Sequence, residues 1–168
     1  MASMITFHVP EDHDLLAAFE VLSLRHEHLN YILRMTIKTL GGLSVEEALD
    51  ATAYDGSARL RERINKLARQ RLGEGQPLLR LQAILERCRR ATEKRNELIH
   101  NVWAKELDGE AFRKGSDHSR QPLPSVQELQ NLTQEIESLT HTLNAARVEG
   151  FLAEALSRSR SSSQTRDA

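Results

Sequence analysis

The stretch that decides the fold is residues 77–104, PLLRLQAILERCRRATEKRNELIHNVWA. Its apolar positions recur every three or four residues, as one face of an α-helix does. That face carries Leu81, Leu85, Cys88, Thr92, Arg95, Ile99 and Val102. The spacing therefore predicts a long, uninterrupted helix, with Arg95 at a position where an apolar residue is expected.

Four more helices are predicted around this one. Ser44 with Glu47, and Ser125 with Glu128, have the spacing of capping boxes, which open helices. Gly150 interrupts the last helical pattern, where it relieves a close contact or a bend. The expected bounds of the four helices are about 12–40, 44–53, 57–72 and 125–156.

These patterns predict an all-α protein, an antiparallel helical bundle of about five helices, three long and two shorter. A single domain is expected over residues 12–156, with a loop at 105–124 that is rich in Gly, Pro, Asp and Ser. We expect residues 1–11 to be a loosely ordered lead-in. Residues 157–168, rich in Ser and Arg, are expected to form a disordered tail.

The charge of the chain is uneven. The net charge is −1, but residues 57–95 hold 12 Lys or Arg and 4 acids, a local charge of +8. Such a band either attracts a phosphate backbone or forms solvated faces paired with acidic helices, and both interpretations stay open.

No apolar run spans a bilayer and no signal peptide is evident, so we expect a cytoplasmic protein without a membrane partner. The single Cys88 is expected to be a buried small hydrophobe. Phosphate-binding, dinucleotide-binding and zinc motifs are lacking from the sequence. His26, Glu27 and His28 are too close along a helix to converge on a metal ion, so no metal or other cofactor is expected.

A constellation of polar residues lies late in the longest helical pattern. Arg95 and Asn96 are followed by His100 and Trp103. An Arg fork binds phosphate oxygens, and a His titrates near neutrality and serves as acid or base. The candidate catalytic residues are therefore Arg95, Asn96 and His100. Arg89, Arg90 and Lys94 are candidate substrate-binding residues, and His26, Glu27 and Trp103 are candidate supporting residues.

The Arg95-Asn96 pair followed by His100, within a helical bundle, resembles the R-N-x-x-x-H motif of the HEPN (higher eukaryotes and prokaryotes nucleotide-binding) domain family. The resemblance implies a homodimeric, metal-independent endoribonuclease of toxin or phage-defence type that acts on RNA, often with an antitoxin partner. Two alternatives remain. The protein is a non-catalytic dimerisation or partner-docking module, or Arg95 packs against Glu20 or Glu27 while His100 caps the helix end.

Overall fold

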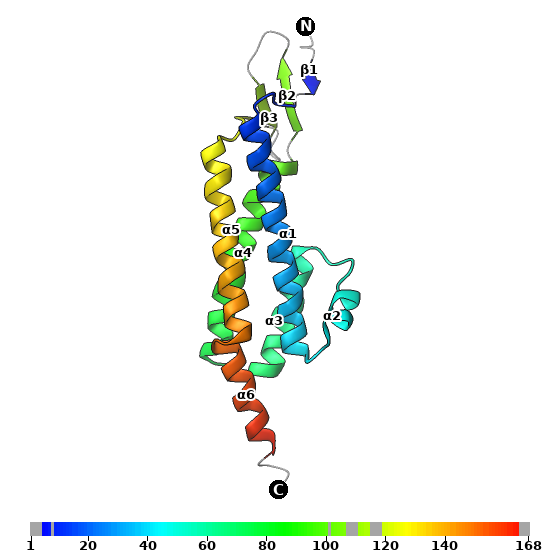
Figure 1. Ribbon diagram of the computed structural model, residues 1–168, viewed down its shortest axis with the longest axis vertical. Helices are drawn as coiled ribbons and strands as arrows, with labels where there is room; N and C mark the ends of the chain where they lie inside the picture. Colours follow the sequence, from blue (N-terminus) through cyan, green and yellow to red (C-terminus); the bar gives the residue numbers. More distant parts are fainter. Residues whose placement is uncertain (1–4, 8, 101, 107–110, 115–118, 165–168) are drawn as a thin grey trace.

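The computed structural model describes residues 5–7, 9–100, 102–106, 111–114 and 119–164. For residues 5–7, 100, 102–106, 111 and 160–164 it describes only the backbone. Helices dominate the described chain, which confirms the predicted all-α helical bundle (Figure 1). The helices are α1 His13–Gly41, α2 Val45–Ala51, α3 Ser57–Leu72, α4 Gln76–His100, α5 Val126–Val148 and α6 Phe151–Gln164.

The long helices run in two directions. α4 runs antiparallel to α1, α3 and α5, whereas those three run in one direction (Figure 1). The contacts agree, because the first half of α1 packs on the second half of α4 and on the first half of α5. A chain segment that contains α2 carries the chain from the end of α1 back to its middle, where α3 begins.

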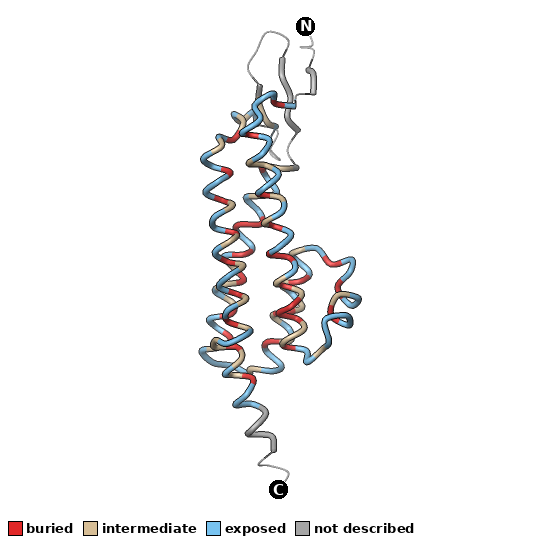
Figure 2. The backbone as a smooth tube through the Cα atoms, viewed as in Figure 1, coloured by how far each residue is buried: buried red, intermediate tan, exposed pale blue. Residues whose placement is uncertain are grey.

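The core consists of two clusters, made largely of leucine and isoleucine, and Ile84 packs against both. Buried positions recur along the long helices (Figure 2). The seam predicted on α4 is buried from Leu81 through Thr92, and Cys88 is fully buried. Removing a leucine side chain from water contributes roughly 1.5–3 kcal/mol. The α4 seam therefore fixes which face of this helix points inward and which face is left for a site.

The helix ends confirm the capping predictions. The Asp12 side chain accepts hydrogen bonds from two backbone N–H groups at the start of α1. Ser44 and Ser125 both form complete capping boxes, with Glu47 and Glu128 respectively. After α1 the chain turns at Gly42, whose φ of 67° is a left-handed conformation that favours glycine.

The predicted loop at 105–124 and the loosely ordered lead-in need correction, because both contribute to a small antiparallel sheet. Its strands are β1 Ile5–Phe7, β2 Val102–Glu106, β3 Ala111–Lys114 and β4 Arg120–Pro122, in that order. The sheet lies at one end of the bundle (Figure 1). Along the chain, β1 precedes α1, whereas β2, β3 and β4 lie between α4 and α5. The predicted helix through residue 104 is also too long: α4 ends at His100, and Val102 enters β2.

The predicted disordered tail is wrong over 157–164, since α6 continues to Gln164. Leu152 and Leu156 are buried in the core, and the Arg80 guanidinium lies 4.4 Å from the Phe151 ring centroid. These contacts anchor the start of α6, and helix formation propagates from an anchored turn more easily than it begins. Residues 165–168 lie outside the described part of the chain.

Over the described residues, none of the helices combines the length and apolar character that a membrane span requires.

Candidate functional site

Three of the polar residues singled out in the sequence, His26, Glu27 and Arg95, meet where α1, α3 and α4 converge. α4 contributes Thr92 and Arg95, α1 contributes His26 and Glu27, and the first turns of α3 contribute Arg61. In a plain core these positions would be apolar, since an unpaired buried polar group is costly. The convergence brings together residues that are up to about 70 positions apart in the chain.

His26 is the most buried member of this cluster, with only 4% of its surface exposed. Its Nε2 atom lies 3.3 Å from the Thr92 hydroxyl oxygen, and its Nδ1 atom lies 3.9 Å from a Glu27 carboxylate oxygen. Burial, and then the positive charge of Arg95, lower the pKa of His26 to about 4, against an opposing effect of Glu27. The ring is therefore neutral at pH 7 and acts as a hydrogen-bonding group there.

Arg95 is half-buried, and it couples electrostatically to both α1 residues. Its Nη1 atom donates a hydrogen bond to the Asn96 Oδ1 atom over 3.2 Å. Burial lowers the pKa of Arg95, and the nearby Glu27 carboxylate acts in the opposite direction. Arg95 remains a cation at pH 7, partly removed from water, where its charge acts more strongly on a bound anion.

The other half of the predicted motif lies at the end of the same helix. His100 is the last residue of α4, one turn beyond Asn96, and its side chain lies outside the described residues. Trp103 is in β2, opposite Arg113 of β3, and its side chain also lies outside them. The backbone thus places Asn96 and His100 on one side of α4.

A hydrogen-bonded relay that the sequence did not suggest supports Glu27. The Asn30 Nδ2 atom donates to Glu27 over 3.3 Å, and the Ser57 hydroxyl donates to the Asn30 Oδ1 atom over 2.6 Å. Ser57 is the first residue of α3, so this relay ties α3 to α1. Neither Asn30 nor Thr92 was predicted as a site residue, because single polar residues on helical seams are common.

The predicted substrate-binding residues differ in their surroundings. Arg89 forms ion pairs of 2.6–2.7 Å with Glu86 and Glu93, and Arg90 pairs with Glu86 over 3.0 Å. These hydrogen bonds lower the pKa of Glu86 to about 2, so its charge persists at neutral pH. Lys94 is exposed. Part of the basic band is therefore balanced by acids on its own helix, as one of the two interpretations predicted.

Within the described ranges, no three His, Cys, Asp or Glu side chains group closely enough to hold a metal ion. Comparison with protein-family models, curated proteins and solved structures gives no significant match. The functional proposal therefore rests on the geometry of a helical bundle with a half-buried arginine and a neutral, buried histidine.

Proposed function

We propose that this protein is a HEPN-like, metal-independent endoribonuclease that acts on RNA through Arg95, Asn96 and His100. The observation that carries the proposal is the half-buried Arg95, bonded to Asn96 at 3.2 Å, one turn before the end of α4. A partly desolvated guanidinium beside a titratable residue suits a reaction in which negative charge grows on a phosphate.

The reaction follows from this chemistry. A base removes the proton of a ribose 2′-hydroxyl, and that oxygen attacks the adjacent phosphorus. The bond from phosphorus to the 5′ oxygen breaks, an acid protonates the leaving oxygen, and the products are a 2′,3′-cyclic phosphate and a 5′-hydroxyl. His100 serves as base or acid. The Arg95 fork holds the non-bridging oxygens, and Asn96 fixes its orientation.

Each motif supplies one histidine for acid–base chemistry, His100. His26 does not add a second one, because it is buried and neutral at pH 7. Two protomers with facing motifs complete an acid and base pair, so the proposal includes a cytoplasmic homodimer. A protein antitoxin that covers the shared site is the expected partner of such a nuclease.

Cleavage of a single-stranded RNA in EDTA tests the proposal. The products are expected to carry cyclic phosphate ends, and a DNA of the same sequence is expected to stay intact because it lacks the 2′-hydroxyl. Arg95→Ala is expected to lower the rate at least about 100-fold, the size of the loss of one electrostatic donor. Cleavage of the DNA, or full activity of Arg95→Ala, contradicts the proposal.

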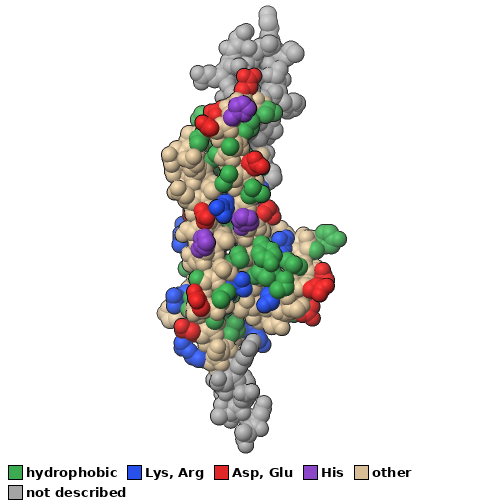
Figure 3. All heavy atoms as spheres, viewed as in Figure 1, with side chains coloured by type: hydrophobic (Ala, Val, Ile, Leu, Met, Phe, Trp, Pro, Cys, Tyr) green, Lys and Arg blue, Asp and Glu red, His purple; other side chains and the backbone are tan. Residues whose placement is uncertain are grey.

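A second candidate function is a non-catalytic dimerisation or docking module, and one exposed stripe of α1 favours it. The stripe has the spacing of a coiled-coil seam and lies on the side of α1 away from the core. It consists of Ala17, Val21, Leu24, His28 and Tyr31. Figure 3 shows hydrophobic side chains exposed along α1, with the densest group beside its lower half, on the side toward α2.

Light scattering after gel filtration tests this second candidate. Leu24→Glu is expected to convert a dimer to a monomer, because it places a charge in the stripe. Leu79→Glu is the matched control, since Leu24 and Leu79 are both 55% exposed and Leu79 lies on α4. Equal masses for the wild type and both variants mean that the stripe is not an interface.

A further inference from the structure

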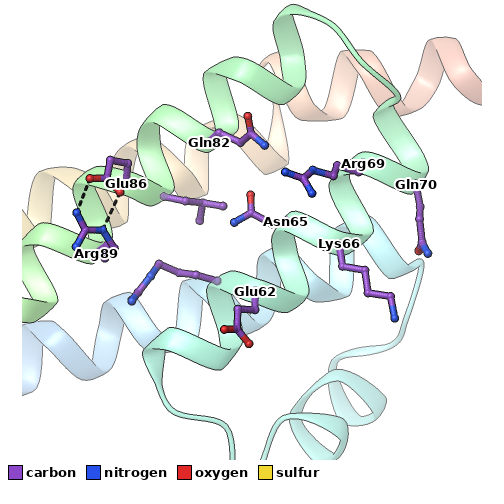
Figure 4. Close-up of a pocket in the computed structure, with 10 residues that line it drawn as sticks. Glu62, Asn65, Lys66, Arg69, Gln70, Gln82, Glu86 and Arg89 are labelled. Carbon is purple, nitrogen blue, oxygen red and sulfur yellow. Dashed lines mark hydrogen bonds and ion pairs between the residues drawn. The ribbon is translucent and has the colours of Figure 1, made fainter.

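The face of α3 that looks toward α4 forms one wall of a polar groove. The groove has a volume of about 680 Å³, within the range of ligand pockets. Its lining comes from one face of each helix: Arg61, Glu62, Asn65, Lys66, Arg69 and Gln70 of α3, and Gln82, Leu85, Glu86 and Arg89 of α4. Side chains of α3, Asn65 and Arg69 among them, point toward Gln82 on α4 (Figure 4).

Two atoms of this lining lack hydrogen-bond partners. The Arg61 Nη1 atom and the Asn65 Oδ1 atom are buried, and neither has a partner among the described residues. Burial also lowers the pKa of Arg61. An unsatisfied donor and an unsatisfied acceptor in one groove call for a ligand that offers both an acceptor and a donor.

The charges of the groove narrow the class of ligand. Arg89 is held by Glu86 and Glu93, as the dashed lines to Glu86 in Figure 4 indicate. Lys66 and Arg69 form no ion pair with a described residue. The open cations, with Arg61, suit phosphate oxygens, and the amides of Asn65 and Gln82 suit the donor and acceptor edges of an unpaired base.

The groove also points at the proposed nuclease site. Gln82, Glu86 and Arg89 lie on one face of α4, and the same spacing of three and four residues continues through Glu93 and Asn96 to His100. At 1.5 Å per residue, Arg89 and His100 are roughly 16 Å apart along this face. A strand that lies in the groove therefore reaches the end of α4.

We propose that the α3–α4 groove binds single-stranded RNA, with Arg61, Lys66 and Arg69 on phosphates and Asn65 and Gln82 on base edges, and leads the strand to the helix end at His100. The identity of the ligand as RNA rests on the proposed function. The groove shares Arg61 with the cluster around His26, but its lining does not include Arg95, Asn96 or His100, so binding and cleavage are measured separately.

Binding is measured by fluorescence anisotropy of a labelled single-stranded RNA, with full-length protein that carries His100→Ala so that the probe is not consumed. Arg61→Gln and Arg69→Gln are expected to weaken binding about tenfold each, the size of one charge-assisted hydrogen bond. Each is also expected to reduce the slope of log K against log salt by about 0.7. Arg71→Gln on α3 and Arg87→Gln on α4 remove charge outside the groove and are expected to stay within about twofold.

The amide residues give a different signature. Asn65→Ala and Gln82→Ala are expected to reduce the preference among homopolymer RNAs while leaving the salt slope unchanged, because they contact bases and not phosphates. Lys66→Gln and Arg69→Gln change exposed residues, so their effects do not depend on whether Arg61→Gln folds.

Groove variants that bind as the controls do, or no RNA binding at all, overturn the inference. Equal affinity for duplex RNA, or displacement of the probe by an equimolar acidic peptide, also overturns it, since the groove would then read charge alone. Groove-dependent binding without cleavage by the wild type rejects the nuclease and keeps the groove. If the groove variants cleave RNA at the wild-type rate, the groove is rejected and the nuclease is kept.

Discussion

The imidazole of His26 on α1 lies 3.3 Å, Nε2 to Oγ1, from the hydroxyl of Thr92 on α4, one turn from Arg95. This contact joins α1 and α4 where polar residues, His26 and Thr92, occupy positions in the otherwise apolar seams of the two helices. It keeps a neutral ring beside a cation, since burial and Arg95 hold the pKa of His26 at about 4.

The stability of the protein should therefore depend on His26 between pH 7.5 and 4.5. The unfolded state takes up a proton near pH 6.5, whereas the folded state resists it until about pH 4. Stability is thus highest above pH 6.5 and falls as the pH drops, by roughly 2–3 kcal/mol at pH 4.5. Urea unfolding of the wild type and His26→Gln at both pH values measures the difference; parallel losses in the two proteins contradict it.

Arg95→Gln should raise the pKa of His26. Two positive charges, Arg95 and Arg61, lower this pKa, and Arg95 has the larger effect. An NMR titration of the His26 ring measures this shift directly. Arg87→Gln, which removes a charge elsewhere on α4, is the control and should leave the titration unchanged. If Arg95→Gln leaves the pKa of His26 unchanged, the side chains of His26 and Arg95 are not neighbours.

The helices that are defined by local sequence patterns were predictable. The repeat of three and four residues located α1, α3 and α4, and two serine–glutamate pairs located helix starts, because each signal arises within a few turns of one helix. The β-sheet was not predictable in this way. Ile5 pairs with Glu106 across about 100 residues, and strands of three residues are too short to display alternation.

The site was predictable in part for the same reason. Arg95 and His26 each stood out as a polar residue in an otherwise apolar seam, and the structure brings them together. The α3–α4 groove was hidden, because Asn65 and Gln82 become neighbours only once α3 packs against α4. Sequence spacing reports the face of one helix, and the pairing of faces depends on the whole core.

Asp55 should stabilise the start of α3. Its buried carboxylate lies 3.1 Å from Arg59 Nε and 2.7 Å from Arg63 Nε. Asp55→Asn is expected to cost about 1–3 kcal/mol of unfolding free energy, since the buried carboxylate loses its charge-assisted contacts with both arginines. Glu86→Gln, which breaks more exposed ion pairs, is the comparison and is expected to cost less than about 1 kcal/mol. Equal losses by thermal or urea unfolding argue against this role.

Gly150 should be required where α5 meets α6, as the sequence predicted. A Cβ atom there would lie 3.0 Å from the Ala146 Cα atom and 3.1 Å from the Ala145 carbonyl oxygen. Both are backbone atoms, so Gly150→Ala is expected to destabilise the protein by about 1–3 kcal/mol. Gly56→Ala has open space within 4 Å and should change stability by less than about 1 kcal/mol. Similar melting temperatures for the two variants contradict the close approach.

The measurement that bears most directly on the nuclease is the rate of RNA cleavage in EDTA by the wild type, His100→Ala and His141→Ala. His141 is an exposed histidine on α5, so its replacement controls for the loss of an imidazole alone. We expect cleavage by the wild type and His141→Ala, and a loss of at least about 100-fold in His100→Ala with unchanged circular dichroism. Cleavage by His100→Ala at the wild-type rate, or no cleavage by any of the three, would contradict the assignment.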